Sequence, residues 1–241
     1  MYNMSNIAKT MELDKIQVNG FKSIKELDLG LKDLNILIGA NGSGKSNFIN
    51  LFKLLNQIVE RNLQSFVGQA GGAETFLFFG SKVTDKIEIR LNFDWNGYNC
   101  ILKPTANDKL IFDIEECLFH NPNYPKPYSE LIGTGSEETN LHEAAKRRPG
   151  KVADHVLKHM QSWLVYHFHD TSDYAKVKKT SDISDNRYFK PDASNLSAFL
   201  YFLQKKHPNH YKNILDTTIM VAPFFKDFIL RPNALNSDKI Q

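Results

Sequence analysis

"GANGSGKSNF", residues 39–48, meets the pattern G-x-x-x-x-G-K-[ST] at Gly39, Gly44, Lys45 and Ser46. Glycine allows a ligand to approach the backbone closely and adopts positive φ angles that other residues resist. In this pattern the backbone amides cradle phosphate groups, the lysine contacts the β- and γ-phosphates, and the hydroxyl binds Mg²⁺. The stretch therefore predicts a loop that binds the phosphates of a nucleotide.

The segments on either side of this loop have the periodicity that the pattern needs. "LNILIG" (34–39) is an almost continuous apolar run, which predicts a strand buried on both faces of a sheet. Apolar residues then recur at intervals of three and four over residues 45–62, which is typical of an amphipathic helix with a broad buried stripe. A strand, a glycine loop and a helix in this order are the context in which the pattern binds phosphate.

Further strands are predicted before and after this core. Residues 13–21 and "IKELDLGL" (24–31) are apolar in rough alternation and flank the turn "NGFKS", so they predict a hairpin. After the helix, three strand-like segments separated by turn residues predict a small inserted antiparallel sheet. These segments are "DKIEIRLNFDW" (85–95), "GYNCILKP" (97–104) and "LIFDIEECLF" (110–119).

The C-terminal half has a weaker pattern. Residues 121–150 are rich in proline and glycine and predict a surface excursion. "SWLVYHF" (162–168) predicts a return to a buried strand. Two helices should follow at residues 193–207 and 208–222. The first should be capped by Asp192 or Ser194, and the second should begin at Pro208.

These segments predict four parts of the chain. They are an N-terminal hairpin with the loop's strand and helix (1–62), an inserted sheet (63–120), a surface excursion with a helix (121–160), and a return strand with a helical segment (161–241).

Composition excludes several classes of protein. The chain has 241 residues, of which 41% are hydrophobic, as expected of a globular protein with a proper core. No apolar run reaches the roughly 18 residues needed to cross a bilayer, and the N-terminus lacks the apolar block of a signal peptide. We therefore expect a cytoplasmic protein. Cys100 and Cys117 have neither metal-ligand spacing nor the number for a disulfide framework, so both should be reduced thiols.

Charge is more informative locally than overall. The net charge of +3 is too small to indicate nucleic-acid binding by itself. However, "HEAAKRRPGK" (142–151) and residues 176–190 are basic. Each is either a solvated face or a surface that contacts a phosphate backbone.

The flanks of the loop carry a resemblance to a known family. "KIQVNGFKSIKELDLGLKDLNILIGANGSGKSNFINLFKLL" resembles the N-terminal end of the RecF/SMC/ABC-class ATPases, and more narrowly the AAA-type bacterial ATPases akin to RecF and to overcoming-lysogenization-defect (OLD) proteins. The resemblance covers residues 12–61 and is weaker over 163–172 and 185–203. It implies an α/β fold, the N-terminal lobe of a P-loop NTPase of ABC/SMC type, with an inserted antiparallel β-sheet and a helical C-terminal part.

The resemblance also implies a set of site residues, with ATP and Mg²⁺ as cofactors. Lys22 and Ser23 stand at the family's "F-[KR]-[SN]" and should lie near the adenine or the α-phosphate. "HFHD" (167–170) stands where the family has its Q-loop, so His169 or Asp170 would replace the glutamine; the alternative is a structural histidine and a loop-capping aspartate. Lys45 is expected in catalysis and Ser46 at Mg²⁺. The expected nucleotide-binding residues are Lys22, Ser23, Gly39, Asn41, Gly42, Ser43, Gly44, Lys45, Ser46 and Asn47.

Two motifs of this class are missing from the sequence. A Walker B strand would end in Asp-Glu, and a signature motif would cap the γ-phosphate of a partner subunit. The nearest imitation, "LIFDIEE" (110–116), has Asp113 and Glu115, and strand alternation predicts both carboxylates on the same face. We therefore expect the chain to be the N-terminal lobe of a larger ATPase, either truncated or one part of a split protein, that binds nucleotide more readily than it hydrolyses it.

Two functions remain open, and a third fits less well. The first is an ATP-hydrolysing head that forms a homodimer or higher oligomer around nucleotide and acts with DNA or a nuclease partner in genome maintenance or phage defence. The alternative is a non-catalytic, nucleotide-gated interaction module. A small-molecule P-loop kinase fits the loop but not the hairpin or the inserted sheet. Two histidine pairs, His155 with His159 and His167 with His169, lack a third ligand at recognisable spacing for a metal site.

Overall fold

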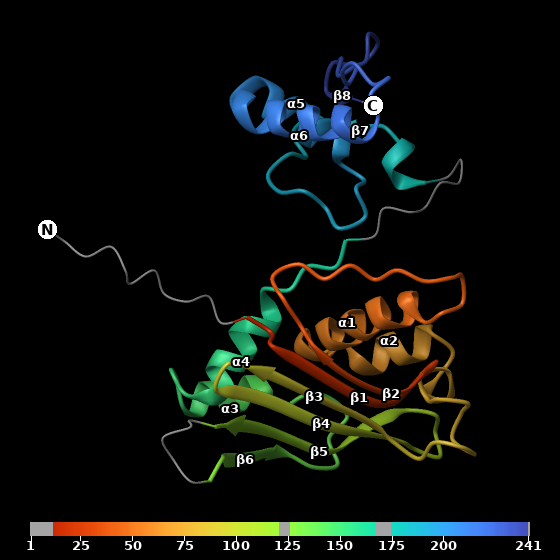
Figure 1. The fold of residues 1–241 in the computed structure, drawn as a ribbon, viewed down its shortest axis with the longest axis vertical. Coiled ribbons are helices and arrows are strands. Elements are labelled where there is room, and N and C mark those ends of the chain that lie inside the picture. The colour runs from red at the N-terminus through yellow and green to blue at the C-terminus, as the bar shows by residue number, and fades with distance from the viewer. Residues whose placement is uncertain (1–11, 121–125, 167–174, 241) are drawn as a thin grey trace, which may run out of the picture. The chain divides into compact units, whose positions relative to one another are not determined.

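The structure is a computed structural model that describes residues 12–120, 126–166 and 175–240. The chain forms two compact units, Met1–Trp163 and Leu164–Gln241 (Figure 1). The first unit holds a sheet with helices against it. The second holds two helices joined to longer irregular segments.

One six-stranded antiparallel sheet, in the order β2-β1-β3-β4-β5-β6, organises the first unit (Figure 1). The predicted hairpin is confirmed as β1 and β2, and the three predicted inserted strands are β3, β4 and β5. They do not form a separate sheet, because β3 pairs with β1 and places Ile89 opposite Val18 on the buried face. The strands are β1 (Lys15–Phe21), β2 (Ile24–Gly30), β3 (Ile87–Phe93), β4 (Asn96–Pro104), β5 (Leu110–Phe119) and β6 (Tyr128–Gly133).

The predicted amphipathic helix is confirmed as α1 (Lys45–Val59), which ends slightly earlier than expected. Together with α2 (Leu63–Gln69) it lies against one face of the sheet (Figure 1). Its inward side chains join the strands in one hydrophobic core. The fully or nearly fully buried residues of α1 are Leu51, Leu54, Leu55, Ile58 and Val59. The remaining helical segments of this unit are the 3₁₀ turn η1 (Ala73–Phe76), α3 (Leu141–Arg147) and α4 (Val152–Gln161).

The expected surface excursion contains regular elements that were not predicted. Residues 128–133 form β6 and 141–147 form α3, while 121–125 lie outside the described residues. Ile132 and Leu141 are buried in the main core. The prolines and glycines around these short elements interrupt any periodicity, and for that reason the elements could not be predicted from apolar spacing.

The apolar run before the loop is not a buried strand. Leu34, Ile36 and Ile38 are 77%, 73% and 91% exposed, and the segment has no regular secondary structure. A strand needs hydrogen-bonded neighbours, and no described strand pairs with this run. The return strand at 162–168 is likewise absent from its described part, where Leu164 is exposed. Residues 167–168 lie outside the described residues.

A β-bulge in β5 turns the carboxylates of Asp113 and Glu115 to different faces of the sheet, although strand alternation predicted them on the same face. On β4, Ile101 and Leu102 pair with Ile114 and Phe112, so Asp113 is the additional residue of the bulge. Asp113 faces outward and forms an ion pair of 3.0 Å with Lys103. Glu115 is fully buried, so the prediction of a shared face was wrong.

Glu115 joins β5 to the start of α3. One carboxylate oxygen accepts hydrogen bonds from the Tyr98 hydroxyl (2.7 Å) and the Thr139 hydroxyl, and the other accepts from the backbone N–H of Asn140 (2.8 Å). Burial raises the pKa of this carboxyl, and the hydrogen bonds oppose the shift. Cys100 and Cys117 lie nearby as free, buried thiols whose pKa is also raised by burial, which confirms the expectation that both are reduced.

The second unit contains the two predicted helices, α5 (Leu196–Lys206) and α6 (Pro208–Val221), and Pro208 opens α6 as expected. The cap prediction was wrong, because the N-cap of α5 is Asn195 and no side chain bonds the helix there. Asp192 instead accepts a hydrogen bond from the Ser194 amide. The short elements of this unit are η2 (Lys176–Lys178), β7 (Ser181–Asp182) and β8 (Lys239–Ile240). No helix in the described ranges has the length and apolar character needed to cross a bilayer.

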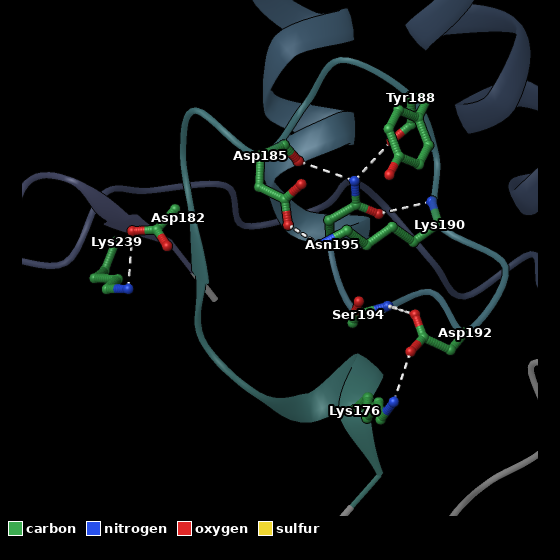
Figure 2. Close-up of polar contacts among 9 residues, drawn as sticks. All are labelled: Lys176, Asp182, Asp185, Tyr188, Lys190, Asp192, Ser194, Asn195 and Lys239. Carbon is green, nitrogen blue, oxygen red and sulfur yellow. Dashed lines mark hydrogen bonds and ion pairs between the residues drawn. The ribbon is translucent and has the colours of Figure 1, made fainter.

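Asn195 organises the loop that precedes α5 (Figure 2). Its buried side-chain amide donates to the carbonyls of Asp185 (2.9 Å) and Tyr188 (2.8 Å) and accepts from the N–H of Lys190 (3.0 Å). A buried amide whose groups are satisfied in this way fixes the path of the loop.

Ion pairs in this loop neutralise part of the positive charge of residues 176–190. Lys176 pairs with Asp192 at 2.9 Å, and Lys190 pairs with Asp185 (Figure 2). The hydrogen bond from Lys176 lowers the pKa of Asp192 to about 2. Two cations of the stretch are therefore already matched by carboxylates within their own unit.

Glu115→Gln should destabilise the first unit, and the loss should depend on pH. The amide has only one acceptor oxygen, so its NH2 group faces either the Asn140 N–H or the Tyr98 and Thr139 hydroxyls that now donate to Glu115; the loss of such a hydrogen bond costs about 1–3 kcal/mol. Because the folded-state pKa of Glu115 is raised, its contribution is complete below the unfolded value of about 4.3 and is lost as pH rises through the folded value. The difference in unfolding free energy between wild type and variant should therefore shrink as pH rises.

Urea titrations followed by tryptophan fluorescence measure this difference, because both tryptophans, Trp95 and Trp163, lie in the first unit. The exposed Glu60→Gln is the matched control. A difference that stays constant from acid to alkaline pH would contradict the assignment.

Asn195→Ala should loosen the loop of residues 185–195 in the second unit. Three backbone groups lose their partner, at about 1 kcal/mol or more for each that stays buried. Hydrogen exchange followed by mass spectrometry should show protection in this loop falling by roughly tenfold or more. Asn213→Ala, at an exposed position of α6, makes the same chemical change and should leave the loop unaltered. Equal exchange in the two variants would show that Asn195 does not hold the loop.

Candidate functional site

The glycine loop depends on two residues in the left-handed region. Gly42 has φ 83° and Gly44 has φ 93°, both of which are strained for residues with a side chain. Gly44 is the N-cap of α1, so the helix begins at Lys45, directly after the loop. The backbone conformation therefore explains two of the glycines.

Gly39 is required by contact rather than by its φ angle. A Cβ atom at this position would lie 2.7 Å from the Oγ of Ser43. The Ser43 amide donates to the carbonyl of Ala40 at 3.2 Å, which closes a tight turn within the loop. A side chain at residue 39 would force this turn apart.

Lys45 folds back over the loop. Its Nζ donates to the carbonyls of Gly39 (2.6 Å) and Ala40 (2.8 Å) and to the Oγ of Ser43 (3.3 Å). The ammonium group is thus held at the centre of the loop, next to the start of α1. A positive charge at this point is positioned to attract an anion that enters the loop.

The start of α1 supplies further donors. The backbone amides of residues 44–47 have no hydrogen-bond acceptor among the described residues, as expected for the first turn of a helix. These amides carry the positive end of the helix dipole. Together with the ammonium of Lys45 and the exposed hydroxyl of Ser46, they form a donor set that fits the phosphates of a nucleotide and the oxygen ligation that Mg²⁺ prefers.

Ser23 and Lys22 are adjacent in sequence, but the structure separates their side chains. Ser23 reaches the loop, where its Oγ accepts a hydrogen bond from the side-chain amide of Asn47 at 2.7 Å. Lys22 has a positive φ of 50°, and its Nζ donates to the Thr75 carbonyl at 3.0 Å and lies 4.6 Å from the centre of the Phe76 ring. Partial burial lowers the pKa of Lys22. Its expected contact with nucleotide stays a prediction.

A cleft of about 430 Å³ opens beside the loop. Its polar side is formed by Ser23, Ser43, Gly44 and Lys45. Its other side is apolar, and sequence reasoning did not assign it to the site. The alternation of β2 is the signal from which part of this wall could have been found. The apolar lining residues are Ile24, Leu27, Leu29, Ile36, Leu37, Ile38 and Phe48.

The histidine pairs and Asp170 are the remaining candidates. His167, His169 and Asp170 lie outside the described residues, so their expected roles stay predictions. The His159 ring stacks on Phe93 at 5.7 Å, and burial lowers its pKa. Among the described residues, no group of three or more metal-ligating side chains comes together. No carboxylate is found among the described residues that line the cleft.

Comparison with known proteins places this geometry in a family. A search of curated proteins gave no match. Residues 11–222 match a family model described as AAA ATPase domain, and this match includes the glycine loop, the whole six-stranded sheet and helices α1 to α6. The family assignment supports a P-loop ATPase of AAA type, which agrees with the expectation from the loop. The chain belongs to the AAA ATPase domain family.

Proposed function

We propose that this chain binds ATP with Mg²⁺ in the cleft beside residues 39–47. The observation that carries the proposal is the convergence of the Lys45 ammonium and the free amides of residues 44–47 on one point of the loop. Each hydrogen bond between a charged group and a phosphate oxygen contributes about 1.5–3 kcal/mol. Several such bonds in one loop are enough for specific nucleotide binding.

Individual residues would have distinct roles. Lys45 would exchange its carbonyl acceptors for phosphate oxygens, and the Ser46 hydroxyl would be a ligand of Mg²⁺. Mg²⁺, when bound, would neutralise part of the phosphate charge. Asn47 would hold Ser23 against the loop, and the apolar wall of the cleft suits a base.

Hydrolysis would require groups beyond those that line the cleft. A carboxylate must polarise the attacking water, and none of the lining residues has one. The exposed run of Leu34, Ile36 and Ile38 lies directly before the loop and presents apolar surface suited to a covering strand. We therefore propose an ATPase head of RecF/SMC/OLD-like type in which a second lobe or a second subunit covers this run and supplies the carboxylate.

The setting of this activity is part of the proposal. A head of this type would dimerise around nucleotide and act with DNA or a nuclease partner in genome maintenance or phage defence. The second candidate function is a nucleotide-gated interaction module without hydrolysis. The cleft without a carboxylate favours this candidate equally well.

Lys45→Ala should weaken binding of ATP by at least about tenfold, because at least one charge-assisted hydrogen bond is lost. Calorimetric titration with a non-hydrolysable ATP analogue and Mg²⁺ measures this change. Lys53→Ala, a substitution of the same kind further along α1 and outside the cleft, is the control and should bind normally. Equal affinity in the Lys45 and Lys53 variants would rule out this loop as the site.

The chain as it stands should release phosphate from ATP at a rate near background and no faster than its Lys45→Ala variant. The reason is that no lining residue can polarise the attacking water. A phosphate-release assay over hours measures the rate. Robust turnover that Lys45→Ala abolishes would contradict the need for a completing lobe. The same assay on a longer product of the gene, where one exists, separates the ATPase from the non-catalytic module.

A further inference from the structure

A second cleft, of about 640 Å³, lies at one end of the sheet. The turn that contains Ser23 lies at the opposite end. The floor of the second cleft is a row of residues on three neighbouring strands: Asn96 on β4 pairs with Phe119 on β5, which pairs with Tyr128 on β6. The Ser23 turn follows the other end of β1, beyond Phe21. The second cleft is therefore separate from the nucleotide site.

The wall of the second cleft comes from the connection between α3 and α4. Arg148, Lys151 and His155 line it. The connection has a defined path, because Gly150 adopts φ 71° and its amide donates to the Asp154 carboxylate at 2.8 Å. The cationic side chains are thus presented by a fixed turn rather than by a loose loop.

The cleft is lined by two full cations, Arg148 and Lys151, and by one carboxylate, Glu130. The Arg148 side chain is 59% exposed, donates to the Tyr128 hydroxyl at 3.2 Å and pairs loosely with Glu130 at 3.5 Å. Lys151 has no carboxylate partner among the described residues. Asp154, the other nearby acid, is already engaged by Lys158 and by the Gly150 amide. One cation of the cleft therefore remains uncompensated.

Aromatic surface accompanies these cations. Tyr128 is 45% exposed at the floor of the cleft. Trp95, also 45% exposed, does not line the cleft itself, but its ring lies 6.4 Å from that of Phe119, which does. Half-exposed aromatic faces beside lysine and arginine are the combination with which proteins hold unpaired bases and their phosphates.

We propose that this cleft binds single-stranded nucleic acid, with a base stacked on Tyr128 and the adjoining phosphates on Arg148 and Lys151. The volume suits one or two nucleotides. Stacking on Tyr128 needs a base released from a duplex, so double-stranded nucleic acid is a poor ligand for the site. The inference deepens the proposed function, in which the head acts with DNA, by naming the form of nucleic acid and its site; it does not require the glycine loop.

The test measures, by fluorescence anisotropy, the binding of a labelled oligothymidylate to the full chain without ATP. An oligonucleotide of about 12 nucleotides is within the site sizes of proteins that bind single strands. Lys151→Ala should weaken binding about fivefold or more and reduce the slope of log K against log salt by about 0.7, as expected for one lost contact with a single strand. Lys82→Ala, an exposed lysine with the same charge change outside the cleft, should bind as wild type.

A second pair of variants tests stacking. Tyr128→Leu should weaken binding about fivefold or more, whereas Tyr128→Phe, which keeps the ring, should bind nearly as tightly as wild type. Lys45→Ala should also bind normally, so failure of the nucleotide site and failure of this site are distinguishable. Equal weakening by Lys82→Ala and Lys151→Ala, tighter binding of a duplex, or equal affinity for free thymidine monophosphate would overturn the proposal.

Discussion

Burial of the apolar stripe of α1 against the antiparallel sheet is the constraint on which the rest of the first unit depends. The stripe includes Leu51, Leu55 and Ile58, which are fully buried. Each such side chain contributes about 1.5–3 kcal/mol when it leaves water. Because the helix can bury this stripe in only one orientation, its first turn, and with it the glycine loop, is held beside the β1–β2 turn, where Asn47 meets Ser23.

Local chemistry could be predicted from the sequence wherever one residue type has one physical role. The loop, the helix after it, the hairpin and five of the six strands of the sheet follow from glycine placement and apolar periodicity. The separation of Asp113 from Glu115 could not be predicted, since a β-bulge adds one residue and reverses the faces beyond it. The direction of the Lys22 side chain could not be predicted either, because its positive φ turns the side chain away from Ser23 and towards Phe76.

Long-range placement was the other limit. From the sequence pattern, residues 85–119 were predicted to form an inserted sheet. In the structure β3 pairs with β1 of the hairpin, because the two strands place their apolar side chains on the same face of the sheet, towards α1. The second cleft was equally hidden. Phe119, Tyr128 and Lys151 are distant in sequence, and only strand pairing and the α3–α4 turn bring them to one place. The basic stretch 142–151 could be recognised in the sequence, whereas its proximity to Phe119 and Tyr128 could not.

The wrong prediction at residues 34–39 bears most directly on function. Its apolar pattern is that of a strand with neighbours on both sides, and the described residues provide none. Leaving Leu34, Ile36 and Ile38 in water forfeits about 1.5–3 kcal/mol each relative to burial. The run leads directly into Gly39, so any strand that covered it would also approach the loop. A second lobe that covered this run, as proposed above, would bring a carboxylate to the nucleotide in the same event, and hydrolysis would then depend on assembly.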